Sequence, residues 1–415
     1  MRNVFIGALM AAAVGLCSCG GCASKPESVS TVKVDGGAGY PENSPVADHG
    51  RLQVIGKQLC DEAGNPVQLA GMSTMGWQWC GDCYTRESIE NLVKEWNISI
   101  LRLAMYVEEE GYNTDPEGFT KKMCEFIDIC GDLGIYCLVD WHVLCPGNPL
   151  DPKYAGADEF FHHIANKYAN KSHVLYEICN EPNNCQEKGD TTKPWVCTKE
   201  ANVTWDMIAE YANRIIPVIQ SEYDAVAAPH PIIIVGTPQW DQLVDACLKE
   251  GMCQGNGKDI CEEYPVRDAR LKQDNIMYTF HFYANEHNSG FEKDGKPDFY
   301  NMYSYMYDVF AKLPIFCTEF GPTDADGNGV VAYDKTDTWL LMFEGRNAGT
   351  QLVSYCCWSY SDNYRTSSVL KPGACERQAW NDLTPAGEYI KKVLAVVNGG
   401  AKDTTVLKIS NIYKK

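Results

Sequence analysis

Eight short apolar segments alternate with segments of helical periodicity, and this alternation restricts the fold more than any other feature of the chain. The apolar segments are residues 66–71, 98–105, 135–141, 174–179, 232–236, 276–281, 315–319 and 352–358. Between them, apolar residues recur every three or four positions, as at Ile89, Leu92 and Trp96. Strands that alternate with helices pair in parallel, and eight such units close a barrel. We therefore predict an α/β fold, a single-domain (β/α)8 TIM barrel over residues 49–398, in preference to an open doubly wound sheet.

The residues before this domain are typical of a targeting segment followed by a linker. Arg2 precedes an apolar run from Val4 to Leu16 that is too short to span a bilayer stably. The run leads into Leu-Cys-Ser-Cys, ending at Cys19, which resembles a bacterial lipoprotein signal. We predict a lipoprotein-type signal peptide at residues 1–22 with Cys19 lipidated, and a flexible tether at residues 23–48. The protein is then exported, either anchored to a bacterial membrane through Cys19 or simply secreted.

Cysteine usage agrees with export. Three of the 20 cysteines precede Lys25, so 17 follow it, and this odd number leaves at least one free thiol in a monomer. In an exported chain such a number indicates disulfides, whereas in a cytosolic chain it would indicate metal or redox chemistry. Two polar insertions, residues 183–202 and 247–273, carry Cys185, Cys197, Cys247, Cys253 and Cys261. We expect disulfides to staple these insertions, motivated by Cys185 with Cys197, while the connectivity stays open.

Metal-binding patterns in the sequence are incomplete. Cys80-Gly-Asp-Cys83 is the only CxxC, whereas a four-cysteine zinc site needs two such pairs. Residues 324–329 imitate the first half of a calcium loop, but the twelfth position is Lys335 instead of a glutamate. The neighbours Cys356 and Cys357 should alternate in and out of the barrel wall as buried free thiols. We expect no metal and no cofactor.

The net charge of −19 bears on the partners of the protein. Such a charge repels nucleic acid and anionic lipid surfaces, whereas it leaves a neutral polysaccharide open as a partner. We expect a monomer that does not bind nucleic acid. Residues 399–415 form a C-terminal tail whose position the sequence does not define.

The residues at the ends of the predicted strands indicate the chemistry, because active sites of such barrels lie at the carboxyl ends of the strands. These residues are Arg102, Trp141, His142, Asn180, Glu181, Trp240, His281, Tyr283, Glu319 and Trp358. Glu181 and Glu319 could face each other across the barrel mouth, as the cleavage of a glycosidic bond with retention requires. Arg102 beside one carboxylate would keep it ionised. Trp240 and Trp358 offer flat apolar faces to sugar rings.

From about Leu52 to Val397 the chain resembles glycoside hydrolase family five, in the branch of bacterial endo-β-1,4-glucanases. The matching segments are residues 71–74 (GMST), 101–106 (LRLAMY), 134–142 (GIYCLVDWH), 174–182 (VLYEICNEP), 232–237 (IIIVGT), 280–284 (FHFYA), 318–321 (TEFG) and 370–373 (LKPG). The resemblance implies an endo-acting cellulase that cleaves β-1,4-glucan with retention and without a cofactor.

The same resemblance implies a role for each site residue. Glu181 would be the acid/base and Glu319 the nucleophile, with Arg102 and Tyr283 in contact with Glu319. The site of the cleaved sugar would be shaped by His142, Asn180 and His281. Three tryptophans would stack on sugars: Trp358 just before the scissile bond, Trp240 just after it, and Trp79 further back.

The chain also departs from the family pattern. Met75 stands where the branch usually has a histidine, and Phe320 replaces a tryptophan after the nucleophile. Asn363 and Arg365 replace a lysine and a glutamate that hold the outer sugar. These changes keep open a relative that acts on mixed-linkage glucan, xyloglucan or mannan. A non-catalytic surface glycan-binding lipoprotein and a cysteine-rich redox or metal protein are further alternatives.

Overall fold

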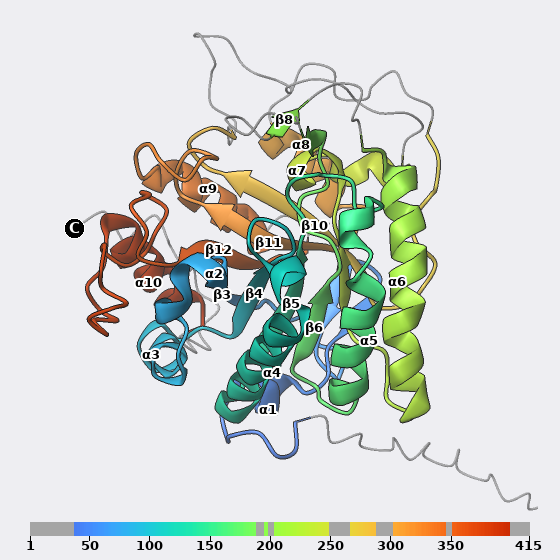
Figure 1. The fold of residues 1–415 in the computed structure, drawn as a ribbon, viewed down its shortest axis with the longest axis horizontal. Coiled ribbons are helices and arrows are strands. Elements are labelled where there is room, and N and C mark those ends of the chain that lie inside the picture. The colour runs from blue at the N-terminus through green and yellow to red at the C-terminus, as the bar shows by residue number, and fades with distance from the viewer. Residues whose placement is uncertain are drawn as a thin grey trace, which may run out of the picture. The chain divides into compact units, whose positions relative to one another are not determined.

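Eight parallel strands form a closed barrel in the computed structural model of the chain (Figure 1). The structure describes residues 37–187, 195–197, 203–248, 266–287, 302–345 and 351–398. In barrel order the strands are β3 (Ala70–Thr74), β4 (Ile100–Tyr106), β5 (Tyr136–His142), β6 (Val174–Glu177), β9 (Ile233–Val235), β10 (Ile276–Tyr283), β11 (Ile315–Gly321) and β12 (Ser354–Tyr360). Each overlaps one of the eight apolar segments, so the predicted (β/α)8 barrel is confirmed.

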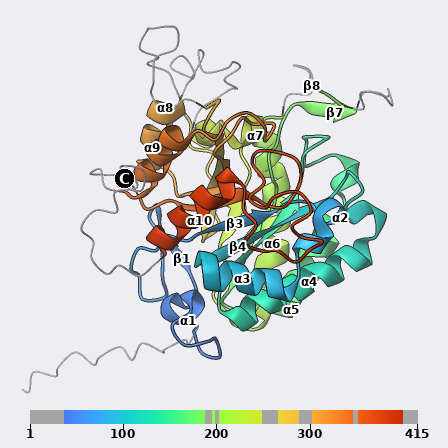
Figure 2. The ribbon, with the colours of Figure 1, turned by 90° about the vertical axis from the view of Figure 1, so that its left-hand side faces the viewer.

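Helices cover the outside of the barrel. The longer ones are α3 (Arg86–Trp96), α4 (Pro116–Leu133), α5 (Ala157–Tyr168), α6 (Trp205–Ala225), α8 (Met302–Phe310), α9 (Tyr333–Phe343) and α10 (Pro385–Val397). The side chain of Thr384 caps α10 by accepting a bond from the Gly387 amide, and α10 packs beside α3 (Figure 2). Within the described ranges, no helix combines the length and the apolar character that crossing a bilayer requires.

The amino-terminal end of the barrel is closed by a short helix and a hairpin. Helix α1 (Pro45–His49) is followed by the hairpin of β1 (Gln53–Ile55) and β2 (Gln58–Cys60). Val46 on α1, Leu52 just before β1 and Leu59 on β2 belong to one apolar cluster. The Tyr40 hydroxyl lies 2.8 Å from His173 Nδ1. The prediction of a flexible tether up to residue 48 is therefore wrong for its described part, which already belongs to the folded domain. Residues 1–36, with Cys19, and the tail 399–415 lie outside the described residues.

Side chains alternate between the interior and the outside of the barrel, as a period of two requires. On β5, Tyr136 and Leu138 belong to the interior cluster, whereas Cys137, Val139 and Trp141 belong to the outer cluster. Trp141 at the end of this strand thus faces α5, where its ring lies 5.2 Å from that of Phe160, and it is absent from the site. Cys356 faces inward and Cys357 outward, both buried and free, as predicted.

Strand β11 breaks this alternation at the position that matters most. Between Cys317 and Phe320 it contains one more residue than its neighbour β12, and the pairing with β10 shifts in the same way. Such a bulge re-aims a side chain. Strict alternation from Phe316 and Thr318 would send Glu319 outward, whereas the bulge turns its carboxylate into the barrel mouth.

Two disulfides lie within the described residues. They join Cys83 to Cys375 and Cys145 to Cys185. A disulfide thus attaches the insertion at residues 183–202, but Cys185 bonds Cys145 instead of Cys197, which lies opposite it in the hairpin of β7 (Cys185–Glu187) and β8 (Trp195–Cys197). Cys247 is a buried free thiol, whereas Cys253 and Cys261 lie outside the described residues.

Candidate active site

Arg102 lies at the centre of a polar layer above the apolar interior, with its side chain fully buried. It reaches the interior because β4 alternates, so that Ile100 and Arg102 share one face. Its Nε and Nη2 donate to the two oxygens of Glu177, at 2.7 and 3.2 Å. Nη2 also lies 3.0 Å from Asp140 Oδ2. Burial disfavours the charge, but the surrounding carboxylates hold the pKa of Arg102 well above its ordinary value. The guanidinium is therefore a fixed cation.

The carboxylate of Glu319 is held at both oxygens. Oε2 accepts a bond of 3.0 Å from Arg102 Nη1, and Oε1 accepts one of 2.5 Å from the hydroxyl of Tyr283. The expected contacts of Arg102 and Tyr283 with Glu319 are thus present. These two donors fix the orientation of the carboxylate. Glu319 is 4% exposed, so that only a small part of it is open to the cleft.

Glu181 has the opposite environment. Burial raises its pKa to about 8, although Arg102 acts in the other direction. Its Oε1 lies 2.9 Å from Nδ1 of His281, and burial lowers the pKa of His281 to about 4. The Thr318 hydroxyl donates to Glu177 Oε1 (2.7 Å), so it accepts from His281 Nε2 (2.8 Å). His281 Nδ1 then carries no proton and accepts a hydrogen bond from the neutral carboxyl group of Glu181.

The two glutamates approach each other closely. One oxygen of Glu181, one oxygen of Glu319 and a ring nitrogen of His281 all lie within 4.8 Å of one another. Glycosidases that retain the anomeric configuration place their two carboxyl groups about 5–5.5 Å apart, whereas inverting enzymes need about 6.5–9.5 Å. The separation in this chain therefore fits the retaining class.

Asn180 and His142 connect Arg102 to the aromatic side chains at the mouth, because Asn180 contacts Arg102 and His142 contacts Trp358. His142 Nδ1 lies 2.7 Å from Asp140 Oδ2, and burial lowers the pKa of His142 to about 3, so that the ring is neutral. Asn180 accepts from Arg102 Nη2 (2.6 Å) and donates to the carbonyl of Val143 (2.9 Å). Both side chains are thus fixed, with the Asn180 amide nitrogen 3.4 Å from His142 Nε2.

Aromatic rings line the mouth on one side of the glutamates. The ring of Trp358 stacks on that of His142, with 5.7 Å between the ring centroids. The ring centroid of Tyr106 lies 4.0 Å from that of His142. Trp79, on α2 (Trp77–Cys80), meets Tyr106 edge to face at 4.9 Å and is 44% exposed. Trp358, His142, Tyr106 and Trp79 thus form a chain of contacting rings, of which Trp79 is the most exposed.

Trp240 lies on the other side, in a strained turn. It belongs to α7 (Pro238–Asp241), where Gln239, Trp240 and Asp241 all adopt left-handed φ values of 55–58°. Such a conformation costs roughly 1–2 kcal/mol for each residue other than glycine. The Trp240 amide donates to the carbonyl of Pro182 (3.1 Å), so that the turn adjoins the segment of Glu181.

Comparisons with known proteins agree with this geometry. The family model described as cellulase, glycosyl hydrolase family 5, matches residues 60–364. The chain belongs to glycosyl hydrolase family 5. It is 36% identical over 375 residues to endoglucanase E-5 of Thermobifida fusca, a match that covers 89% of this chain and 69% of that protein. It is also 36% identical over 356 residues to endoglucanase MaCel5A of Microbulbifer sp. (strain ALW1), covering 84% of this chain and 59% of the relative.

Solved structures of family 5 resemble the barrel as a whole. Cellulase Cel5C_n matches with a TM-score of 0.68 and 37% identity, covering 86% of this chain and 95% of that one. The catalytic domain of Thermobifida fusca endoglucanase Cel5A (E5) matches with a TM-score of 0.67 and 34% identity, covering 85% and 99%. A variant of that domain has been solved in complex with cellotetraose. The chain spans 69% and 59% of the length of these two curated relatives.

Of the residues predicted for this family 5 site, Trp141 faces outward and the other ten lie around the barrel mouth, but sequence reasoning missed four further members. Asp140, Glu177, Asp241 and Thr318 are buried and contact predicted residues. Asp140 precedes His142 by two positions and shares its inward face, and Glu177 is a charge within an apolar strand. Both patterns could have revealed them, whereas nothing in the sequence singles out Asp241.

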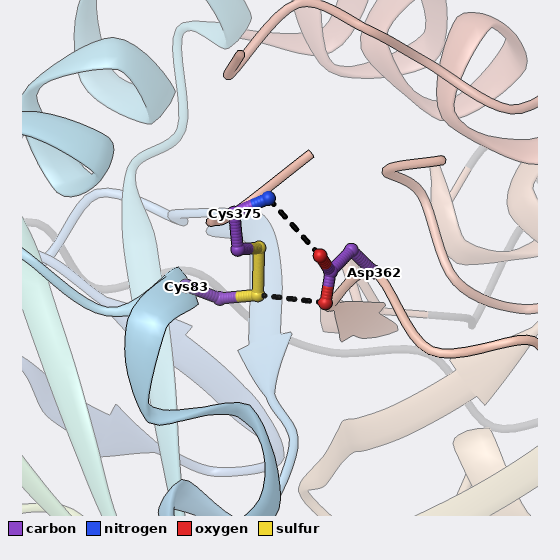
Figure 3. A group of neighbouring side chains, drawn as sticks. All are labelled: Cys83, Asp362 and Cys375. Atoms are coloured by element: carbon purple, nitrogen blue, oxygen red, sulfur yellow. Dashed lines mark hydrogen bonds between the residues drawn. A yellow bond between two sulfur atoms is a disulfide. The ribbon is translucent and has the colours of Figure 1, made fainter. Parts of the chain in front are cut away.

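The departures from the family 5 pattern meet at the outer rim of the cleft. Asn363 Nδ2 lies 2.8 Å from the sulfur of Met75, so two of the exchanged residues contact each other. Phe320 instead lies outside the barrel, stacked on Phe282 at 5.2 Å. The rim is tied down by the disulfide between Cys83 and Cys375 (Figure 3).

Asp362 completes this attachment. Its Oδ2 accepts a bond of 3.0 Å from the amide of Cys375, and its Oδ1 lies 3.4 Å from Cys83 Sγ (Figure 3). The disulfide thus links the segment directly after α2, the helix that carries Trp79, to the segment after β12, which carries Asn363. Two loops that are 292 residues apart in the sequence form one rim.

Proposed function

We propose that the chain is an endo-acting β-1,4-glucanase that cleaves with retention, with Glu319 as nucleophile and Glu181 as acid/base. The short separation of the two carboxylates at the mouth of a family 5 barrel carries this proposal. The names of the relatives support the activity, since they are endoglucanases and cellulases. The contrasting environments of the two glutamates support their roles.

In the first step, Glu319 attacks the anomeric carbon of a glucosyl unit. Its carboxylate is suited to this attack because Arg102 and Tyr283 hold both oxygens in a fixed orientation. Glu181 donates its proton to the departing oxygen, which requires a neutral carboxyl group at the pH of the reaction. A pKa of about 8 keeps Glu181 protonated at neutral pH. The step leaves a glucosyl ester on Glu319 and an ionised Glu181.

In the second step, Glu181 accepts a proton from water, and the water attacks the anomeric carbon from the same face. The ester bond to Glu319 breaks, and the two inversions together retain the configuration. The neutral ring of His281 supports the return of the proton, because its Nδ1 accepts a bond from protonated Glu181.

The glucan chain crosses the mouth from the aromatic side to Trp240. Trp358 is the platform for the sugar before the scissile bond, and Trp79 serves a sugar further back. Trp240 receives the sugar of the leaving group. His142, Asn180 and His281 surround the cleaved sugar. This assignment is supported by the resemblance of these segments to family 5.

Product analysis tests the activity and the mechanism together. We expect reducing sugars from carboxymethylcellulose and lichenan, with a fast fall in viscosity because an endo-acting enzyme cuts within chains. Proton NMR should detect the β-anomer first. In Glu181→Ala, a dinitrophenyl cellobioside should give a burst and a sugar adduct on the peptide with Glu319. An α-anomer first, or an adduct on the Glu181 peptide, would contradict the mechanism.

The altered rim favours one second candidate. Met75 and Asn363 occupy the outer sugar site and contact each other, so that recognition of a plain glucosyl unit there is changed. Mixed-linkage glucan, xyloglucan or mannan would then be the preferred polymer. We would measure kcat/KM on each of these polymers and on carboxymethylcellulose side by side. A kcat/KM more than tenfold higher on mixed-linkage glucan, xyloglucan or mannan than on carboxymethylcellulose would make that polymer the main substrate in place of β-1,4-glucan.

We also propose that the protein is exported and anchored through Cys19. The signal-like residues 1–22 and the presence of two disulfides support export, because disulfides persist outside the reducing cytosol. Expression in a bacterial host with a radioactive fatty acid should label the protein, and Cys19→Ala should abolish the label. Label that survives this substitution would show that Cys19 is not the anchor.

A further inference from the structure

Asp241 is a fully buried carboxylate that the mechanism above leaves without a role. It ends the short helix α7 and contacts three elements at once. One oxygen accepts the amide of Thr237, and the other accepts the amide of Glu181 at 2.9 Å. The second oxygen also lies 3.5 Å from His281 Nε2. One side chain thus touches the turn of Trp240, the backbone of Glu181 and the ring that contacts the Glu181 carboxyl group.

Both segments that Asp241 joins have an unfavourable backbone conformation. Glu181 has a φ of 35°, and the turn from Gln239 to Asp241 is left-handed throughout. Residues other than glycine hold such angles only where the surroundings fix them. The bonds of Asp241 to the amides of Thr237 and Glu181 supply such a restraint on both segments.

A carboxyl group is the side chain that fits this position. Two backbone N–H groups point at its two oxygens, so both oxygens must accept hydrogen bonds. An asparagine of the same size would turn an NH2 group toward one of these N–H donors, and serine has a single oxygen. The charged and titratable groups nearest to Asp241 are His281 on β10, Glu181 after β6 and Glu177 on β6.

We propose that Asp241 is a positioning residue that aligns the proton donor Glu181 with the leaving-group side of the cleft at Trp240. This inference rests on the proposed roles of Glu181 and Trp240. When the clamp is intact, the acid and the platform for the departing sugar keep one fixed relation. When it is removed, Glu181 remains present, but its proton no longer points at the departing oxygen.

The test compares two substrates that differ in their need for a proton. Cellotetraose has a sugar leaving group that departs only with protonation, whereas the dinitrophenolate of a dinitrophenyl cellobioside departs without it. For Asp241→Asn and Asp241→Ala we expect kcat/KM on cellotetraose to fall about 10- to 100-fold, as misplacement of a catalytic group does. On the aryl substrate the rate of the burst should change less than about threefold, because dinitrophenolate departs without a proton. The contribution of about 10²–10⁴-fold from proton transfer applies only where the leaving group needs a proton.

A merely structural role would give a different result, because a damaged barrel mouth lowers both rates together. Asp337→Asn is the matched control. Asp337 is also a buried carboxylate, but it accepts the Tyr389 hydroxyl (2.6 Å) on the helical side of the barrel, and its loss should leave both rates unchanged. If the Asp241 variants fail to fold, the double variant Gln239→Gly with Asp241→Asn replaces them, because glycine adopts the left-handed angle without strain.

Glu181→Ala, measured in the same assay, separates this inference from the proposed function. A large difference between the two substrates in Glu181→Ala, with equal or absent losses in the Asp241 variants, would overturn the positioning role alone. No difference in Glu181→Ala would refute the role of Glu181, and the inference would fail with it. Differences in both would support the clamp.

Discussion

The lower half of the barrel interior, at the amino-terminal ends of the strands, is apolar, whereas the upper half, at their carboxyl ends, is polar and charged. In the lower half, inward side chains such as Leu138, Leu175 and Phe316 form an apolar cluster closed by α1 and the first hairpin. Two residues further along the same faces lie Asp140, Glu177 and Thr318. Along a strand, two residues therefore separate the apolar side chains that stabilise the fold from the polar side chains of the active site.

The difference teaches where the barrel gains and loses free energy. Burial of apolar side chains in the lower half stabilises the fold by about 25 cal/mol for each Å² removed from water. In the upper half, Arg102 is the fixed cation among Asp140, Glu177 and Glu319, and burial of these charges is unfavourable unless they are paired. The lower half thus supports an upper half that is optimised for reaction.

The largest expected effect is the loss of the nucleophile. Glu319→Gln should lower kcat on the order of 10⁴-fold or more on every substrate, because no other group can form the glycosyl ester. An activated leaving group should not restore the rate, in contrast to variants of Glu181. Reducing-sugar assays and dinitrophenolate release measure this, and residual activity above about 1% with a correctly folded protein would show that another residue is the nucleophile.

Arg102→Lys comes next and should affect both activity and stability. Lysine keeps one charge but cannot bond Glu177 at two points and reach Glu319 and Asn180 as well. We expect a loss of about 3–5 kcal/mol in the free energy of unfolding, as for a broken buried pair. The catalytic rate should fall about 10²-fold through misplacement of Glu319.

Arg214→Lys is the control for this change. Arg214 pairs with Asp158 at 3.0 Å on the surface, where both side chains are more than a third exposed. Such pairs contribute about 0–1 kcal/mol, so urea unfolding of this variant should match the parent within that range. Equal effects of the two lysine substitutions would mean that Arg102 is no more than an ordinary ion pair.

Two substitutions on β6 test the difference between the lower and upper halves within a single strand. Leu175 and Glu177 both face inward, two residues apart. Leu175→Ala should lower the free energy of unfolding by about 2–5 kcal/mol while the folded enzyme keeps its kcat/KM. Glu177→Gln should lower kcat about 10- to 100-fold with a smaller change in stability, because it loosens Arg102 and Thr318. If both variants lost activity equally, the two halves would not be functionally distinct.

Much of this division could be predicted from the sequence. The eight apolar segments defined the barrel, and period-two alternation explains why Arg102 and His142 reach the interior while Trp141 does not. Resemblance of short motifs located the two glutamates and their contacts. What the sequence could not give depends on backbone detail: the bulge at Thr318 that turns Glu319 inward, and the left-handed turn that brings Asp241 to Glu181.

Other errors have a physical origin as well. Spacing suggested Cys185 with Cys197, and the structure does place them opposite each other, but Cys145 approaches Cys185 from the loop after β5. A tertiary approach of this kind leaves no local pattern. The assignment of residues up to 48 as a tether failed because Ser-Pro composition hides a capped turn of helix, in which Ser44 accepts the Ala47 amide and Val46 is buried.

The smallest of the expected effects is a gain of stability, and it follows from the high pKa of the acid/base. Glu181 has a folded pKa of about 8 because it is buried, against an ordinary value of 4.5. Between these pH values the unfolded chain has released the proton and the folded protein retains it. The folded state then binds more protons than the unfolded state, so stability falls as the pH rises through this window.

Glu181→Gln removes this loss, because an amide does not titrate. The variant should match the parent near pH 4.5 and exceed it by an amount that grows with pH, reaching about 1–3 kcal/mol at pH 7. Leu175→Ala provides the control, since it changes no titrating group and its deficit should stay nearly constant across the same range. Urea unfolding at several pH values measures both. A Glu181→Gln variant that gains nothing with rising pH would mean that Glu181 is already ionised in the folded enzyme, and it would then be an acid only while substrate excludes water from the cleft.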